Sequence, residues 1–105
     1  MKKKVQRLMK FLLPYRPERV YLFGSWAKGE EDELSDLDVV VIKSTDSPFL
    51  DRLKEVASLL PLDVGGVDVL VYTPDEFAMM QRQGNAFAEM INEEALLIYD
   101  QQTES

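Results

Sequence analysis

The chain has 105 residues, a net charge of −7, no Cys and no His. This length fits one domain, residues 1–105, and 46% hydrophobic residues suffice for a single core. The composition excludes a disulfide framework, a thiolate metal site and an imidazole base, so any metal must be held by oxygen ligands.

The basic start resembles an export signal, but Lys10 interrupts the apolar run that follows it. No apolar stretch approaches the roughly 20 residues that span a bilayer, so we expect a cytoplasmic protein without a membrane partner. Residues 1–19 contain seven Lys or Arg and one acidic residue, whereas the remainder is strongly acidic. An acidic body repels phosphate backbones, which argues against an enzyme that grips long nucleic acid.

The first half of the chain alternates helical and strand patterns. Apolar residues at helical spacing predict an amphipathic helix over about residues 2–13, which Pro14 ends. Residues 19–23 predict a strand because Val20-Tyr21-Leu22-Phe23 is rich in β-branched and aromatic residues, and the strand stops at Gly24-Ser25, where a short helical turn begins. After a polar loop, the continuous apolar run of residues 37–42 predicts a strand buried on both faces.

The second half continues the alternation. Ser47-Pro48 predicts an N-cap and first-turn proline for a second long helix that extends to Pro61. A strand over residues 67–72 precedes Thr73-Pro74-Asp75-Glu76, a capping box that opens another helix. Gly84 breaks or bends that helix, and residues 96–99 form a short last strand. The pattern predicts an α/β (α+β) domain with a small mixed sheet of three to four strands packed with helices.

Three carboxylates are candidate metal ligands. Asp36 and Asp38 point the same way because side chains alternate along a strand, and Asp68 interrupts a later apolar strand that could lie beside them. Such carboxylates raise one another's pKa unless a cation neutralises them, and magnesium prefers oxygen ligands. Two ions held by shared carboxylates stabilise an in-line displacement at phosphorus, which indicates phosphoryl or nucleotidyl transfer.

A glycine-rich turn is the candidate triphosphate site. Gly24 and Ser25 follow a strand directly, and Gly29 closes the turn. Glycine allows close approach of the backbone, and exposed N–H groups at a turn bind anions. Lys28 lies within the same turn and offers positive charge to a transferring phosphate.

The segments Gly24-Ser25-Trp26-Ala27-Lys28-Gly29 and Ser35-Asp36-Leu37-Asp38, followed by Asp68, resemble the signature of the DNA polymerase β nucleotidyltransferase superfamily. Nearly the whole chain is similar to the minimal nucleotidyltransferases of bacteria and archaea, the antitoxin half of HEPN and MNT toxin–antitoxin pairs. The resemblance implies the nucleotidyltransferase fold, ATP as substrate, two Mg²⁺ ions, and a HEPN-type helical partner protein that accepts AMP on a hydroxyl. It leaves the oligomeric state unknown.

The resemblance also implies roles for particular residues. Gly24, Ser25, Lys28 and Ser35 would bind the nucleotide. The carboxylates Asp36, Asp38 and Asp68 would be catalytic and hold the metal. Lys28 and Trp26 stand where the family often has Arg, and the lysine keeps the charge but loses bidentate geometry. We expect Trp26 to pack rather than to stack on a base.

Two other functions stay open. The chain could neutralise a partner by binding alone, as a non-catalytic antitoxin. Alternatively, it could transfer a nucleotide to a small molecule together with a separate helical subunit. The acidic run of residues 30–33 is better explained as a solvated loop than as further metal ligands, and Asp63 as part of a turn.

Overall fold

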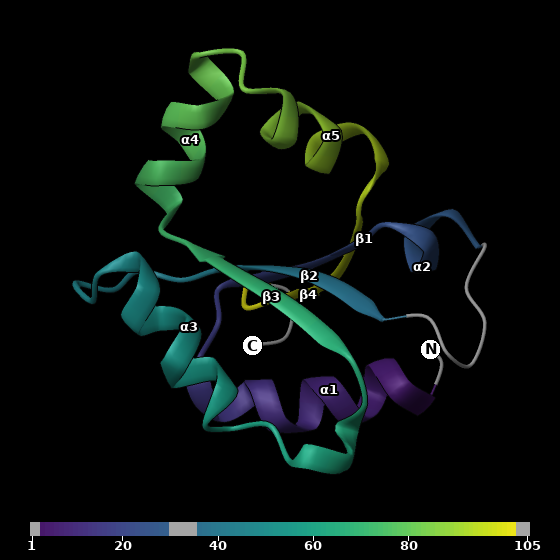
Figure 1. Ribbon diagram of the computed structural model, residues 1–105. Helices are drawn as coiled ribbons and strands as arrows, with labels where there is room; N and C mark the ends of the chain where they lie inside the picture. Colours follow the sequence, from purple (N-terminus) through teal and green to yellow (C-terminus); the bar gives the residue numbers. More distant parts are fainter. Residues whose placement is uncertain (1–2, 30–35, 103–105) are drawn as a thin grey trace.

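The computed structural model describes residues 3–29 and 36–102, and it shows a mixed four-stranded sheet with helices on both faces (Figure 1). The expected fold class is therefore confirmed. In chain order the elements are α1 (Lys3–Leu12), η1 (Leu13–Tyr15), β1 (Arg19–Phe23), α2 (Ser25–Lys28), β2 (Leu37–Ile42), α3 (Phe49–Ala57), η2 (Leu62–Val64), β3 (Val67–Tyr72), α4 (Pro74–Arg82), α5 (Ala86–Glu94) and β4 (Leu96–Asp100).

The strand order is β3-β2-β1-β4, which places β3 and β4 at the two edges. β1 pairs antiparallel with both β2 and β4, whereas β2 and β3 are parallel. Two parallel neighbours need a crossover between them, and α3 supplies it. As a result β2 and β3 begin at the same end of the sheet, and β1 ends there.

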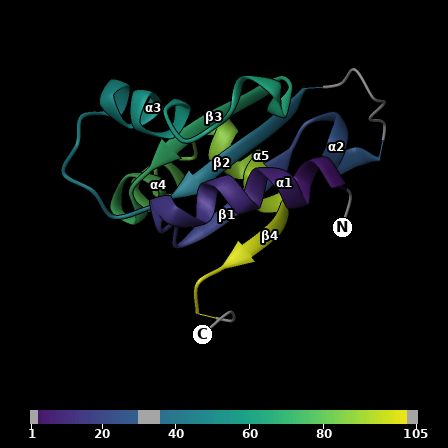
Figure 2. The ribbon, with the colours of Figure 1, turned by 90° about the horizontal axis from the view of Figure 1, so that it is seen from below.

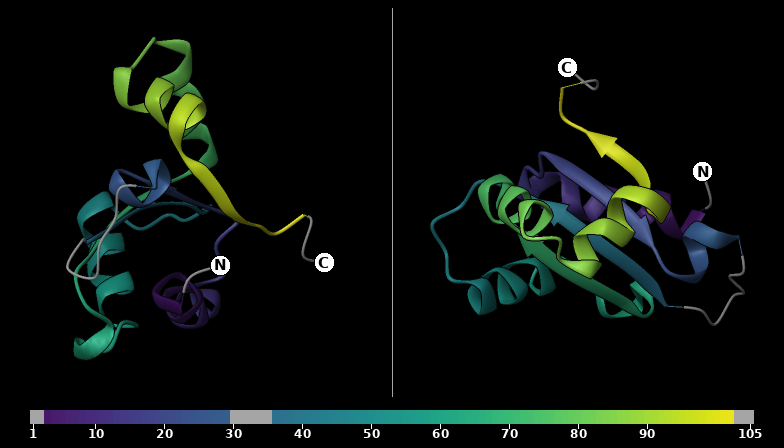
Figure 3. Two further views of the ribbon diagram at one scale, coloured as in Figure 1. Left: turned by 90° about the vertical axis from the view of Figure 1, so that its right-hand side faces the viewer. Right: turned by 90° about the horizontal axis from the view of Figure 1, so that it is seen from above.

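Each face of the sheet is covered by a pair of helices, and the core on one face is larger than the core on the other (Figures 2 and 3). α1 and α3 lie on one face and enclose the larger core, whose fully buried members include Leu8, Leu37, Val39 and Val56. α4 and α5 lie on the other face. The smaller core beneath them is formed by Val40, Ile42, Phe77, Ala88 and Ile91. Both faces of β2 are therefore buried, as its continuous apolar sequence predicts.

The helix α4 begins as the sequence predicts. The Thr73 hydroxyl accepts a hydrogen bond from the backbone N–H of Glu76 at 3.1 Å, and the Glu76 carboxylate accepts one from the backbone N–H of Thr73 at 2.8 Å. This reciprocal capping box satisfies two N–H groups that a helix start leaves without partners. Gly84 has φ +69° and separates α4 from α5, which confirms the expected break.

The predicted start of α3 is wrong by one residue. Pro48, not Ser47, occupies the N-cap position, and no side chain caps the helix. The Ser47 hydroxyl instead donates to Oε2 of Glu55 at 2.8 Å, two turns into the helix. The Ser47 hydroxyl therefore bonds to the Glu55 carboxylate and does not cap the start of the helix.

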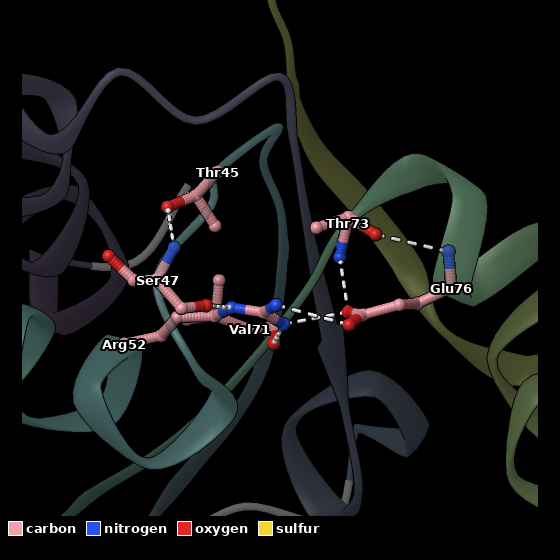
Figure 4. Close-up of polar contacts among 6 residues, drawn as sticks. All are labelled: Thr45, Ser47, Arg52, Val71, Thr73 and Glu76. Atoms are coloured by element: carbon pink, nitrogen blue, oxygen red, sulfur yellow. Dashed lines mark hydrogen bonds and ion pairs between the residues drawn. The ribbon is translucent and has the colours of Figure 1, made fainter.

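Arg52 is buried and ties three elements together (Figure 4). Its guanidinium donates to both carboxylate oxygens of Glu76, at 2.7 and 3.1 Å, and also to the carbonyls of Ser47 and Val71. The pair raises the pKa of Arg52 and lowers the pKa of Glu76, chiefly through their hydrogen bonds. The carboxylate that caps α4 thereby also joins it to α3 and to the last part of β3.

No helix within residues 3–29 and 36–102 is long and apolar enough to cross a membrane.

Candidate active site

The three candidate carboxylates lie at one end of the sheet, where β2 and β3 begin. Asp38 and Asp68 are register partners in the parallel pair, so their side chains leave neighbouring strands on the same face. Asp36 directly precedes β2, two residues before Asp38. This face is the one covered by α4 and α5. Val40 lies two residues after Asp38 on the same strand, so both side chains point to the same face, and Val40 belongs to the smaller core.

The carboxylates differ in exposure and influence one another. Asp36 and Asp68 are exposed, whereas Asp38 is half-buried. Burial raises the pKa of Asp38, and the negative charges of Asp68 and Asp36 raise it further. The structure therefore brings the three acids close enough for their charges to interact, as the sequence analysis expected.

A divalent cation fits the chemistry of this donor set. Three carboxylates supply hard oxygen ligands, and burial together with the negative charges of Asp68 and Asp36 raises the pKa of Asp38. Within residues 3–29 and 36–102, no three acidic side chains already converge on a single point as a closed ligand set. Ion binding would therefore require rotation of these side chains, which the exposure of Asp36 and Asp68 permits.

Two glycines lie directly against the carboxylates. A Cβ atom on Gly24 would clash with Oδ2 of Asp38 and lie 3.3 Å from its Cγ. A Cβ atom on Gly66 would lie 2.5 Å from Cγ of Asp36. A side chain at either position would therefore push the neighbouring carboxylate aside, and the positive φ of Gly24 favours glycine there in addition. The role of Gly66 was missed because Gly65-Gly66 looks like an ordinary turn; its place two residues before Asp68 was the available signal.

The glycine-rich turn lies at the same end of the sheet. Gly24 follows β1 with φ +73°, Ser25 begins α2, and Gly29 ends that helix with φ +74°. Trp26 packs against the larger core, as expected, and Nζ of Lys4 lies 5.9 Å from its ring centroid. The Lys28 side chain and all of Ser35, both predicted nucleotide contacts, lie outside the part of the chain that the structure describes.

The parallel strands β2 and β3 thus carry acids at their start, next to the glycine turn that follows β1. The sequence matches the family described as Polymerase beta, Nucleotidyltransferase over residues 6–104, and the chain belongs to this family. No curated protein matches the sequence significantly.

Two solved structures share the fold. One is a crystal structure of a toxin–antitoxin with AMP-PNP, with TM-score 0.66 and 17% identity; the match covers 98% of this chain and 77% of the other. The second is a putative nucleotidyltransferase from Sulfolobus solfataricus, with TM-score 0.56, 18% identity, and coverage of 97% and 91%. At this identity the likeness is one of fold.

Proposed function

We propose that this chain transfers AMP from ATP to a hydroxyl group on a partner protein, in a reaction that depends on Mg²⁺. The observation that carries the proposal is the in-register pair Asp38 and Asp68 at the acid-rich end of the sheet, beside the Gly24 turn. Membership of the nucleotidyltransferase family supports the class of reaction.

The reaction exchanges one bond at phosphorus for another. The acceptor hydroxyl oxygen attacks the α-phosphorus of ATP, the bond from that phosphorus to the bridging oxygen breaks, and pyrophosphate leaves with the bond electrons. Asp68 accepts the hydroxyl proton, directly or through water, because it is the exposed carboxylate of the pair. Bound Mg²⁺ would neutralise charge on the phosphates and on the leaving oxygen.

The other residues position the nucleotide. Asp36 and Asp38 hold the metal, and the Gly24-Ser25 turn lets the triphosphate approach the backbone at the start of α2. Lys28 and Ser35 complete the nucleotide contacts in this proposal. Gly24 and Gly66 leave room for the carboxylates of Asp38 and Asp36, which a Cβ atom at either position would contact too closely.

We further propose that the partner is a toxin of the HEPN type and that this chain is its antitoxin. The similarity of fold to a toxin–antitoxin structure solved with AMP-PNP supports this assignment.

The decisive test incubates the purified chain with α-labelled ATP, Mg²⁺ and lysate from its source, alongside the Asp36→Asn, Asp38→Asn double variant. We expect one labelled protein band that the double variant does not produce. An exposed acid away from the site, Asp46, provides the matched control, and Asp46→Asn should label normally. Absence of label with both proteins folded would refute protein AMP transfer.

The same variants separate the alternatives. A non-catalytic antitoxin would still neutralise its partner after the double substitution, whereas an enzymatic antitoxin would not. A small-molecule nucleotidyltransferase would label a soluble acceptor and no protein, and only in the presence of its helical subunit.

A further inference from the structure

The edge strand β3 has an open stretch of backbone beside Asp68. The N–H of Leu37 donates to the carbonyl of Gly66, and the N–H of Lys43 donates to the carbonyl of Tyr72. Backbone groups alternate sides along a strand, so even-numbered residues of β3 face β2 and odd-numbered residues face outward. The N–H and C=O groups of Val67 and Val69 therefore point away from the sheet, one on each side of Asp68.

The open stretch ends at Val71. Its outward carbonyl already accepts a hydrogen bond from Nη1 of Arg52 at 3.2 Å. Figure 4 shows this contact between the Arg52 guanidinium and Val71, and because Arg52 is buried there, the outward carbonyl of Val71 is not open to an added strand. Only the first half, which includes Asp68, remains available for pairing within the described part of the chain.

An apolar groove of about 470 Å³ follows this open stretch. Leu53, Val56 and Leu60 line it on the α3 side, Phe23 lines it on the opposite side of the sheet, and Asp68 belongs to the lining. A strand added to β3 would place one side chain next to Asp68 and the two flanking side chains against the α3 residues, because side chains alternate faces.

We propose that this edge binds an extended segment of the acceptor protein as an additional strand, with a hydroxyl residue beside Asp68 and an apolar residue on each side of it. The inference rests on the proposed function and names how the acceptor docks. Asp36, Asp38 and Asp68 give this end of the edge negative charge, which favours basic residues on either side of the docked segment, and the Lys4 ammonium lies beside Gly65 just before β3. Main-chain pairing supplies affinity, and the groove supplies the sequence preference apolar-hydroxyl-apolar.

The binding test uses the capped peptide Lys-Val-Ser-Val-Lys with isotopically labelled protein, followed by amide resonances. At millimolar peptide we expect progressive shifts at Val67 and Val69. The same peptide with alternate backbone amides N-methylated should cause none. The exposed residues Leu96 and Leu97 on the other edge strand, β4, serve as an internal control and should not shift.

A protein variant tests the same contact from the other side. Val67→Pro removes an outward N–H that β2 does not use, and proline is tolerated as the first residue of an edge strand. We expect this variant to keep its fold and its binding of AMP-PNP but to lose the peptide-induced shifts. Absence of shifts at Val67 and Val69 in the native protein, or equal shifts with the N-methylated peptide, would overturn the inference.

Addition of ATP and Mg²⁺ separates the two proposals. Docking with an AMP adduct on the serine supports both. Docking without the adduct keeps the docking inference and counts against hydroxyl transfer. An adduct that forms equally well on Val67→Pro, without shifts on β3, overturns the docking inference and leaves the proposed function intact.

Discussion

The charge conflict at the acid-rich end predicts that Asp38→Asn stabilises the protein when no divalent cation is present. Neighbouring strands lie about 5 Å apart, so the register partners Asp38 and Asp68 place two negative charges close together. Two unit charges at this distance repel by about 1 kcal/mol at the dielectric constant of water and by about 3 kcal/mol at an effective value of 20. Asp68 is exposed, so we expect the lower figure.

Thermal unfolding in a chelator measures this repulsion. A gain of about 1 kcal/mol in the free energy of unfolding raises Tm by roughly 4–8 °C in a domain of this size. Excess Mg²⁺ should reverse the order, because a cation that binds only the folded wild type stabilises it and leaves the variant unchanged. Asp46→Asn removes an exposed acid in the loop after β2 and should show neither effect.

Two results would refute the reasoning. If Asp38→Asn is no more stable than wild type in the chelator, the carboxylates do not repel one another in the folded protein. If Mg²⁺ stabilises both proteins equally, the ion binds elsewhere. Either result would remove the physical basis for a metal site at this end of the sheet.

Three further predictions follow from other contacts. Gly66→Ala should displace the Asp36 carboxylate and weaken the affinity for Mg²⁺ with AMP-PNP by tenfold or more while Tm changes little; calorimetric titration measures both. Arg52→Met should lower the free energy of unfolding by about 2–3 kcal/mol, at the low end for a broken buried ion pair because the Glu76 side chain is 43% exposed, and urea denaturation tests it. The pKa of Glu76 is lowered in the folded protein, so its ionised carboxylate contributes fully to the free energy of unfolding above the ordinary pKa of 4.5. This contribution is lost as pH falls from that value towards the lowered pKa. Glu76→Gln should therefore make the free energy of unfolding depend less on pH in the acid range. If the stability of Glu76→Gln falls with acid pH as steeply as that of wild type, Glu76 is not the group responsible.

The elements themselves could be predicted because their signals are local. The strand over residues 37–42 is apolar throughout, and the capping box at Thr73 uses residues three apart in sequence. The break at Gly84 follows from the conformational freedom of one residue. Each of these patterns is complete within a few residues, so no knowledge of the tertiary fold was needed.

Features that depend on distant partners could not be predicted. The second long helix buries Arg52 more deeply than the apolar Leu53, which nothing in the local sequence pattern indicates. Its charge is accommodated only because Glu76 and two carbonyls come from other elements. The Ser47 hydroxyl was likewise taken by Glu55 rather than by the helix start.

In the candidate site, too, some features have local sequence signals and others depend on residues that are distant in sequence. Asp68 was singled out because a carboxylate within an apolar strand conflicts with strand preference, and Asp36 and Asp38 because their spacing points both side chains the same way. The contact between Gly66 and Asp36 depends on the pairing of β3 with β2 and became visible only with the fold. The order of strands in the sheet was also beyond the sequence pattern.

The parallel pairing of β2 with β3 also sets an order of events during synthesis and folding. β1 and β2 are consecutive strands and pair antiparallel, so they can associate early, but this hairpin contains only two of the three acids. The third arrives with β3, after the whole α3 crossover has been made. A nascent chain that has emerged only as far as α3 would therefore lack the complete acid set, and activity should appear late in refolding, after most helical signal has returned.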